Sequence, residues 1–175
     1  MEQVFRLNHK TKTTLAGVSL LALGVMFQDV SRTCPELKKE LADWEEGRTF
    51  ALGILPHGPG ATFKFENGRI RYLGKGVKDP DVAINFKHID AALLVFTGQM
   101  GAHTASIQGR TVVHGDLGMT MQAVRAMDIV IAYLMPGFFF PNLFKRPPRM
   151  SLNQQLRKAG LLAALPVGLI LNSGK

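Results

Sequence analysis

The chain has 175 residues, a formal charge of +8 and a single cysteine. This length is sufficient for one domain with its own core, so the composition requires neither disulfides nor a structural metal. One cysteine excludes an internal disulfide and favours a reducing compartment, which predicts a cytoplasmic protein.

The positive charge is concentrated in the second half of the chain. Residues 1–90 carry 13 Lys and Arg against 11 Asp and Glu, whereas residues 91–175 carry 8 against 2. Because the basic half is also the more apolar one, the pattern favours binding at a membrane surface over binding to nucleic acid. A basic, solvated surface on a soluble protein is the alternative.

The first predicted helix covers about residues 13–29 and is apolar on nearly every side, so protein or lipid must cover it. Its apolar run, Thr14–Phe27, is shorter than the roughly 20 residues that cross a bilayer, and no cleavage site follows it. We expect a buried or interfacial helix, with an N-terminal signal anchor as the alternative. A second, amphipathic helix begins at Pro35, carries Leu37, Leu41 and Trp44 at helical spacing, and ends at Gly47.

Residues 48–87 alternate apolar and polar side chains between turn signals, which is typical of strands. Asn67-Gly68 predicts a tight hairpin, because both residues tolerate positive φ. We expect an antiparallel meander of four strands, at about 48–55, 61–68, 69–76 and 81–87.

Helices are predicted over 88–101 and 102–109, followed by a strand at 110–115 and a long helix, Leu117–Leu134. This order of elements predicts an α+β domain with helices packed on a mostly antiparallel sheet. We expect a single domain, in which residues 1–47 form an N-terminal helical extension, 48–135 the core and 136–175 a C-terminal aromatic and basic loop with a helical tail.

The tripeptide His114-Gly115-Asp116 lies where the last strand turns into the long helix. Aspartate is a favoured N-cap, so Asp116 is predicted to cap this helix. In a hydrolase-type alternative, His114 and Asp116 act with Ser106 or Thr111 as nucleophile. The sequence contains neither a nucleophile elbow nor a cluster of His and Cys with metal-ligand spacing. No catalytic residue, metal site or cofactor is therefore predicted.

The segment "FKFENGRIRYLGKGVKDPDVAINFKHIDAALLVFTGQMGAHTASIQGRTVVHGDLGMTM" resembles the core of the sterol carrier protein type 2 family. The matching features are a hairpin strand, an Asp-Val-Ala-Ile strand, a helix ending in Thr-Gly-Gln, and "QGRTVVHGD" before a helix that starts with glycine and methionines. The resemblance covers residues 53–135, about half of the chain.

This resemblance implies a five-stranded, mainly antiparallel sheet with helices on one side that enclose an apolar tunnel. It also implies binding of sterols, fatty acyl chains or other lipids without catalytic residues. The apolar helices predicted at the N- and C-terminal ends are additional to the core domain of the family. The terminal "NSGK" is not a peroxisomal targeting signal. We therefore expect a bacterial or archaeal relative.

The long helix has few polar residues, and its methionines, with Met100 nearby, would form flexible walls for a variable ligand. The alternative for each methionine is ordinary core packing. The residues predicted to contact lipid are Phe96, Met100, Ile107, Met119, Val124, Met127, Ile131, Phe138, Phe139 and Phe140.

The segment "MPGFFFPNLFKRPPR" places an aromatic cluster beside basic residues, which is typical of an interfacial membrane contact. The predicted contact residues are Phe138, Phe139, Phe140, Lys145, Arg146 and Arg149. A loop folded over the tunnel mouth is the alternative.

We therefore predict intracellular binding and transfer of an apolar lipid, with an anionic membrane surface as partner and no nucleic acid. The protein would be cytoplasmic and peripheral at the inner membrane face. An accessory factor for isoprenoid quinone or prenyl-lipid biosynthesis, the hydrolase alternative and a homodimer are left open.

Overall fold

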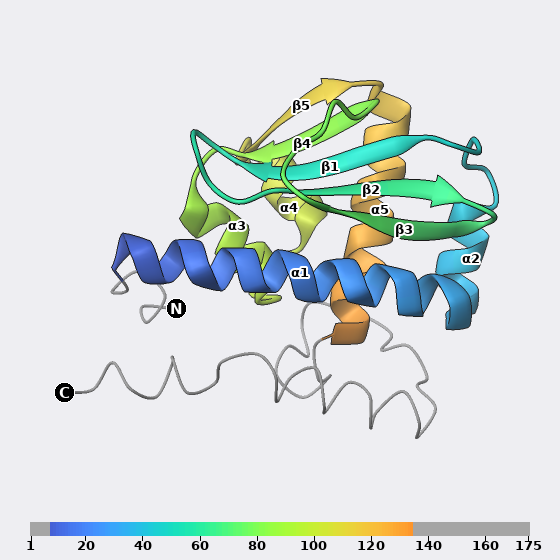
Figure 1. Cartoon of the computed structure of the whole chain (residues 1–175), viewed down its shortest axis with the longest axis horizontal. Coiled ribbons are helices and arrows are strands. Elements are labelled where there is room, and N and C mark those ends of the chain that lie inside the picture. The colour runs from blue at the N-terminus through green and yellow to red at the C-terminus, as the bar shows by residue number, and fades with distance from the viewer. Residues whose placement is uncertain (1–7, 135–175) are drawn as a thin grey trace.

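The structure of the chain is a computed structural model, and it describes residues 8–134. In this part of the chain, helices cover one face of a five-stranded sheet, as expected for an α+β domain (Figure 1). The helices are α1 (His9–Thr33), α2 (Pro35–Leu41), α3 (Ile89–Phe96), α4 (Ala102–Ile107) and α5 (Leu117–Leu134). The strands are β1 (Thr49–Ile54), β2 (Ala61–Glu66), β3 (Arg69–Lys75), β4 (Val82–Phe86) and β5 (Thr111–Gly115).

Element boundaries set by local signals agree well with the sequence prediction. The long helix α5 begins and ends at the predicted residues. Asn67 and Gly68 both adopt positive φ in the tight turn between β2 and β3. The predicted helix at 88–101 ends earlier, at Phe96, because Gly98 adopts a φ of 72° that helices do not continue through.

The prediction that Trp44 continues the second helix is wrong. α2 ends at Leu41, and the N–H of Trp44 donates to the Leu41 carbonyl (3.1 Å) in the turn that follows. This turn brings the indole against the sheet, with its ring centroid 5.7 Å from those of both Phe50 and Phe65. Burial of this large side chain against the strands therefore outweighs helical periodicity.

The predicted antiparallel meander is correct for β1 to β3 and wrong for β4. The strand order is β3-β2-β1-β4-β5, and β4 pairs with β1 in parallel, with Phe50 opposite Val82. Residues 76–81 lead from the edge strand β3 back across the sheet to the other side of β1. Thr62 of β2 holds this connection, because its hydroxyl donates to the Gly76 carbonyl (2.7 Å) and accepts from the Lys78 N–H (3.1 Å). Because β1 pairs with β2 in antiparallel and with β4 in parallel, the sheet is mixed.

The apolar core lies between the sheet and the helices. Successive side chains of a strand point to opposite faces, so alternate residues reach this side. Phe50 and Phe63 stack at a centroid distance of 4.8 Å, and Phe27 of α1 packs on both rings at 5.8 and 5.2 Å. The other strand side chains buried there are Leu52, Ile54, Ala61, Phe65, Ile70, Val82, Ile84 and Phe86.

Helix α1 has the length and composition of a membrane-spanning helix, yet it lies along the sheet (Figure 1). Its Lys12, which is 11% exposed, forms an ion pair of 2.7 Å with Asp90 of α3. Leu21 and Val25 on its outer side are 42% and 39% exposed. The side chains that it buries in the core include Ala16, Leu20, Leu23, Phe27 and Val30. In the described part of the chain α1 is thus packed on the domain.

Candidate functional site

Most of the predicted lipid-contact residues in the described part of the chain lie together in the core. Phe96 of α3 and four residues of α5 are each at most 8% exposed and belong to one apolar cluster: Phe96, Met119, Val124, Met127 and Ile131. Met100, in the segment between α3 and α4, is partly buried and packs against this cluster. α5 therefore supplies an apolar wall on the helix side of the sheet. That this wall encloses a lipid tunnel stays a prediction.

Ile107 is placed apart from these residues. It is the last residue of the short helix α4 and is 73% exposed, because this helix buries its Ala102 and Ala105 side instead. The other predicted contact residues, Phe138, Phe139, Phe140, Lys145, Arg146 and Arg149, lie outside the described residues.

Asp116 is the N-cap of α5, as the sequence predicted. Its carboxylate accepts a hydrogen bond from the Met119 N–H (2.7 Å), and its backbone carbonyl accepts from the Thr120 N–H (3.0 Å). His114 is exposed and pairs with Ala83 in the sheet, on the face away from the helices. Within residues 8–134, no hydrogen bond joins the side chains of His114 and Asp116, and no cluster of metal-binding side chains occurs.

We expect Asp116→Ala to lower the free energy of unfolding by about 0.5–2 kcal/mol, because the first turn of α5 loses its acceptor. Asp116→Asn should retain most of the stability, since an amide oxygen can also accept from the Met119 N–H. Urea unfolding measures both effects. If a folded Asp116→Asn variant failed to bind lipid, the chemical role of this residue would have to be reconsidered.

The start of α4 is capped by a side chain of α5. The carboxylate of Asp128 accepts hydrogen bonds from the N–H groups of Ala102 (2.7 Å) and His103 (3.3 Å). Gly101, at the N-cap position of α4, has no side chain that could do so. Burial raises the pKa of Asp128, and the two N–H groups oppose this shift. Asp128 thus ties the segment that carries Met100 to α5.

The stability contributed by Asp128 should decrease as the pH rises. Because its pKa is raised in the folded chain, the folded state binds this proton more tightly than the unfolded state does. We expect the unfolding free energy of the parent, minus that of Asp128→Asn, to decrease as the pH rises from the ordinary pKa of 3.8 through the raised value. Unfolding curves across this pH range measure the difference. A difference that increases with pH would contradict the prediction.

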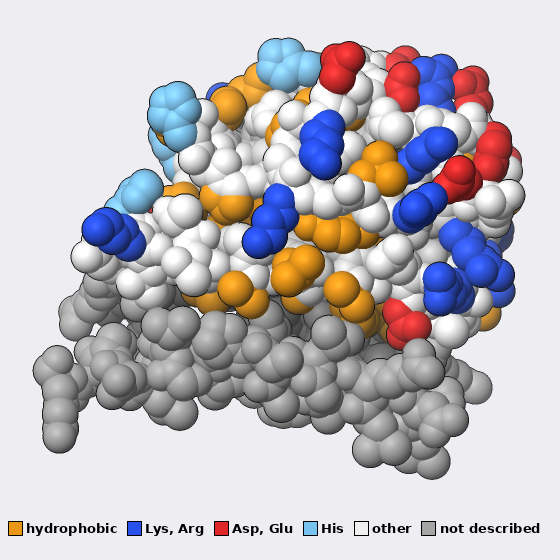
Figure 2. Space-filling view, in the orientation of Figure 1, with side chains coloured by type: hydrophobic (Ala, Val, Ile, Leu, Met, Phe, Trp, Pro, Cys, Tyr) orange, Lys and Arg blue, Asp and Glu red, His pale blue; other side chains and the backbone are white. Residues whose placement is uncertain are grey.

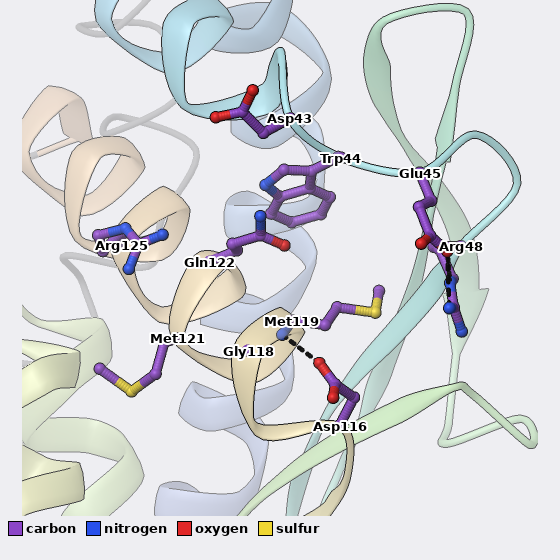
Figure 3. A pocket seen from close by; sticks show the side chains of 10 residues that line it. All are labelled: Asp43, Trp44, Glu45, Arg48, Asp116, Gly118, Met119, Met121, Gln122 and Arg125. Atoms are coloured by element: carbon purple, nitrogen blue, oxygen red, sulfur yellow. Dashed lines mark hydrogen bonds and ion pairs between the residues drawn. The ribbon is translucent and has the colours of Figure 1, made fainter.

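A cavity of about 480 Å³ lies between residues 43–48 and the first turns of α5 (Figure 3). Both apolar and charged side chains line it, and we call it the Trp44 cavity. Its lining residues are Asp43, Trp44, Glu45, Arg48, Asp116, Gly118, Met119, Met121, Gln122 and Arg125.

Ion pairs hold the charged side chains on both sides of the Trp44 cavity. Arg48 pairs with Glu45 at 2.6 Å, and Arg125 of α5 pairs with Glu40 of α2 at 2.8 Å. The amino-acid pattern does not predict this site, because its two walls are about 70 residues apart in the chain. The single tryptophan, in a segment otherwise rich in charge, was the signal that could have indicated it.

The fold is similar to that of several solved structures, whereas no curated protein sequence matches the chain. The conserved hypothetical protein TT1886 from Thermus thermophilus has a TM-score of 0.50 at 17% identity, over 63% of this chain and 84% of that chain. Sterol carrier protein 2 has a TM-score of 0.49 at 16% identity, over 65% of this chain and 90% of that chain. The UbiJ-SCP2 ubiquinone synthesis protein has a TM-score of 0.47 at 14% identity, over 63% of this chain and 89% of that chain. The likeness to the Thermus protein concerns the fold alone.

The sequence profile of the SCP-2 sterol transfer family matches residues 27–128, which is more than half of the chain. The match begins within α1, includes all five strands and reaches into α5. It confirms the resemblance found in the sequence, and membership of this family implies lipid binding or transfer. The chain therefore belongs to the SCP-2 sterol transfer family.

Proposed function

We propose that this chain binds an apolar lipid between α5 and the sheet and presents or transfers it at an anionic membrane surface. The observation that carries the lipid-binding part is the family match over residues 27–128. The buried side chains of Val124, Met127 and Ile131 support it, because they provide an apolar wall on the side of α5 that packs into the domain.

The ligand that we propose is a sterol, a fatty acyl chain or an isoprenoid. Native mass spectrometry of the purified full chain, followed by lipid extraction, tests this directly. A co-purified lipid of one of these classes supports the proposal, and a quinone or prenyl lipid would favour a helper in isoprenoid quinone synthesis. A purified chain that holds no lipid and takes none up from solution would contradict it.

The membrane part of the proposal is supported by how charge is distributed along the chain. Residues 8–134 carry 14 Lys and Arg against 12 Asp and Glu, and Figure 2 shows both signs interspersed on one face. Residues 135–175 carry six Lys and Arg and no acidic residue. Phe138, Phe139 and Phe140 stand in the same stretch, so aromatic and basic side chains are combined there. The single cysteine supports a reducing compartment, and we place this contact at the cytoplasmic membrane face.

We expect the full chain to sediment with vesicles that contain anionic lipid, and to do so less at high salt. Lys145, Arg146 and Arg149 would contribute about 3 kcal/mol together, at about 1 kcal/mol per basic residue near such a surface. Salt weakens this attraction by screening, whereas burial of the phenylalanine rings persists. The variant with Phe138, Phe139 and Phe140 replaced by serine should hardly sediment.

The control for this experiment is the same set of vesicles without anionic lipid, to which the parent chain should bind weakly. If the triple serine variant binds anionic vesicles as well as the parent and still takes up lipid, the three phenylalanines belong to a lid or to the core.

A further inference from the structure

The Trp44 cavity contains a buried hydrogen-bond donor that no group in residues 8–134 satisfies. Trp44 is 7% exposed, and its indole N–H is buried without a hydrogen-bond partner. Buried tryptophan N–H groups usually find a partner, so this one is an exception that calls for a physical reason. Phe50 and Phe65 pack against the ring at 5.7 Å and fix its orientation, so the N–H cannot turn away.

The surroundings of the indole define what kind of group could satisfy it. Figure 3 shows Asp43, Gln122 and Arg125 around the side of the ring that carries the nitrogen. The indole N–H is a donor without a partner in residues 8–134, so it requires an oxygen acceptor on a ligand. The carboxylate of Asp43 is exposed and can accept from a hydroxyl group. A ligand with a carbonyl and hydroxyl groups would therefore fit both sides.

The charge of the lining disfavours an anionic ligand. Three carboxylates, those of Asp43, Glu45 and Asp116, face two guanidinium groups, which leaves one excess negative charge. The guanidinium groups are already paired with Glu45 and Glu40. An additional anion would be repelled, whereas a neutral group would not be.

The size and the apolar part of the lining indicate a small ligand or the head of an amphipathic one. A volume of about 480 Å³ lies within the usual range for small-molecule sites. Met119 and Met121 are the methionines among the lining residues on the α5 side, and Met119 is also a member of the apolar core cluster. Polarizable, flexible side chains of this kind adapt to a short apolar chain.

We propose that the Trp44 cavity binds a neutral glyceryl ester group, such as the head of a monoacylglycerol. The ester carbonyl accepts the indole N–H, and a glyceryl hydroxyl donates to Asp43. This site goes beyond the proposed lipid binding between α5 and the sheet, and it requires no membrane.

The single tryptophan makes the test direct, because the chain has one indole N–H signal in a proton–nitrogen correlation spectrum. The probes are 1-monooctanoylglycerol below its micelle concentration, octanoate and monoacetin, all added to the full chain. We expect 1-monooctanoylglycerol to move the indole signal to lower field and to bind at least ten-fold more tightly than octanoate, which has the same tail with a charged head. Monoacetin shows whether the glyceryl ester alone is sufficient.

The shift of the indole signal and the affinity relative to octanoate distinguish the outcomes. A shift with 1-monooctanoylglycerol alone assigns the site to a lipid head, and a shift with monoacetin as well assigns it to a free glyceryl ester too. If neither ester moves the indole signal, or if octanoate binds as tightly as 1-monooctanoylglycerol, the proposal is overturned.

A variant pair isolates the hydrogen bond itself. Trp44→Phe keeps an aromatic ring against Phe50 and Phe65 and removes the N–H, so calorimetry should show about five-fold weaker binding of 1-monooctanoylglycerol. Tyr72→Phe is the matched control, because it removes a polar atom from a ring that does not line the cavity. Equal affinity in Trp44→Phe and the parent would contradict the assigned role. Uptake of a fluorescent fatty acid should be the same in the parent, Trp44→Phe and Tyr72→Phe. This uptake tests the proposed lipid binding between α5 and the sheet, whereas 1-monooctanoylglycerol binding tests the Trp44 cavity, so the two proposals can fail separately.

Discussion

Replacing Met127 with aspartate should reduce uptake of a fluorescent fatty acid to less than a tenth of the parent level. Met127 is 1% exposed and packs in the apolar cluster on the inner side of α5. A carboxylate there has no partner, so it is either ionised at a large desolvation cost or forced to take up a proton. In both states it places a polar group where we propose that the lipid lies. Val124→Asp should act in the same way, because Val124 is equally buried on the same helix.

The matched control is Met127→Leu, which conserves volume and apolar character and should take up the fatty acid as the parent does. Because an aspartate can also unfold the domain, uptake is compared only among variants that unfold cooperatively in urea. Met127→Gln provides a polar replacement without charge and should weaken uptake less severely. Full uptake by folded Asp variants at both positions would place the lipid elsewhere in the chain.

Replacing Gly115 with alanine should lower the free energy of unfolding by about 3 kcal/mol or more, through strain and a clash. Gly115 adopts a φ of 105°, and a Cβ atom there would lie 2.1 Å from the backbone oxygen of Asp81. Backbone cannot yield as a flexible side chain can, so β5 would have to separate from β4 at the pair Gly115–Val82. This pair lies next to the N-cap of α5, and a shift would also move the wall of the Trp44 cavity.

Gly109→Ala is the control for Gly115→Ala. Gly109 also has a positive φ, of 65°, but a Cβ atom there would meet no atom within 4 Å. Its replacement should therefore cost only the backbone strain, about 1–2 kcal/mol. Urea unfolding of the two variants separates strain from clash. Equal losses at the two glycines would show that the close approach to Asp81 has no energetic consequence.

Local chemistry explains what could be predicted along the chain. Asp116 is predictable as an N-cap because aspartate before an apolar helical run has one predominant local role. The hydrogen bond that its carboxylate accepts from the Met119 N–H confirms the prediction. The hairpin at Asn67-Gly68 follows from the same kind of signal. The family was also recognisable, since small residues at turns and the order of strands and helices are properties of the sequence.

Burial of individual residues was predictable only where helical periodicity continued over several turns. Val124, Met127 and Ile131 lie on α5, where an 18-residue helix defines one inner side. Ile107 belongs to a helix of six residues, which is too short for its pattern to show which side is buried. Its apolar character was therefore a poor guide to its position.

The family, the α+β class, the start of α5 and the apolar side of that helix follow from the amino-acid sequence alone. All of these depend on residues that are close together in the chain. The three-dimensional packing was needed to show that β4 runs parallel to β1 and that Trp44 lies beyond the end of α2 and packs on the sheet. It also brought the 43–48 segment to α5 and formed a cavity lined by Trp44, whose indole N–H has no hydrogen-bond partner within residues 8–134. These features depend on which distant segments bury one another, and local propensities carry no information about that choice.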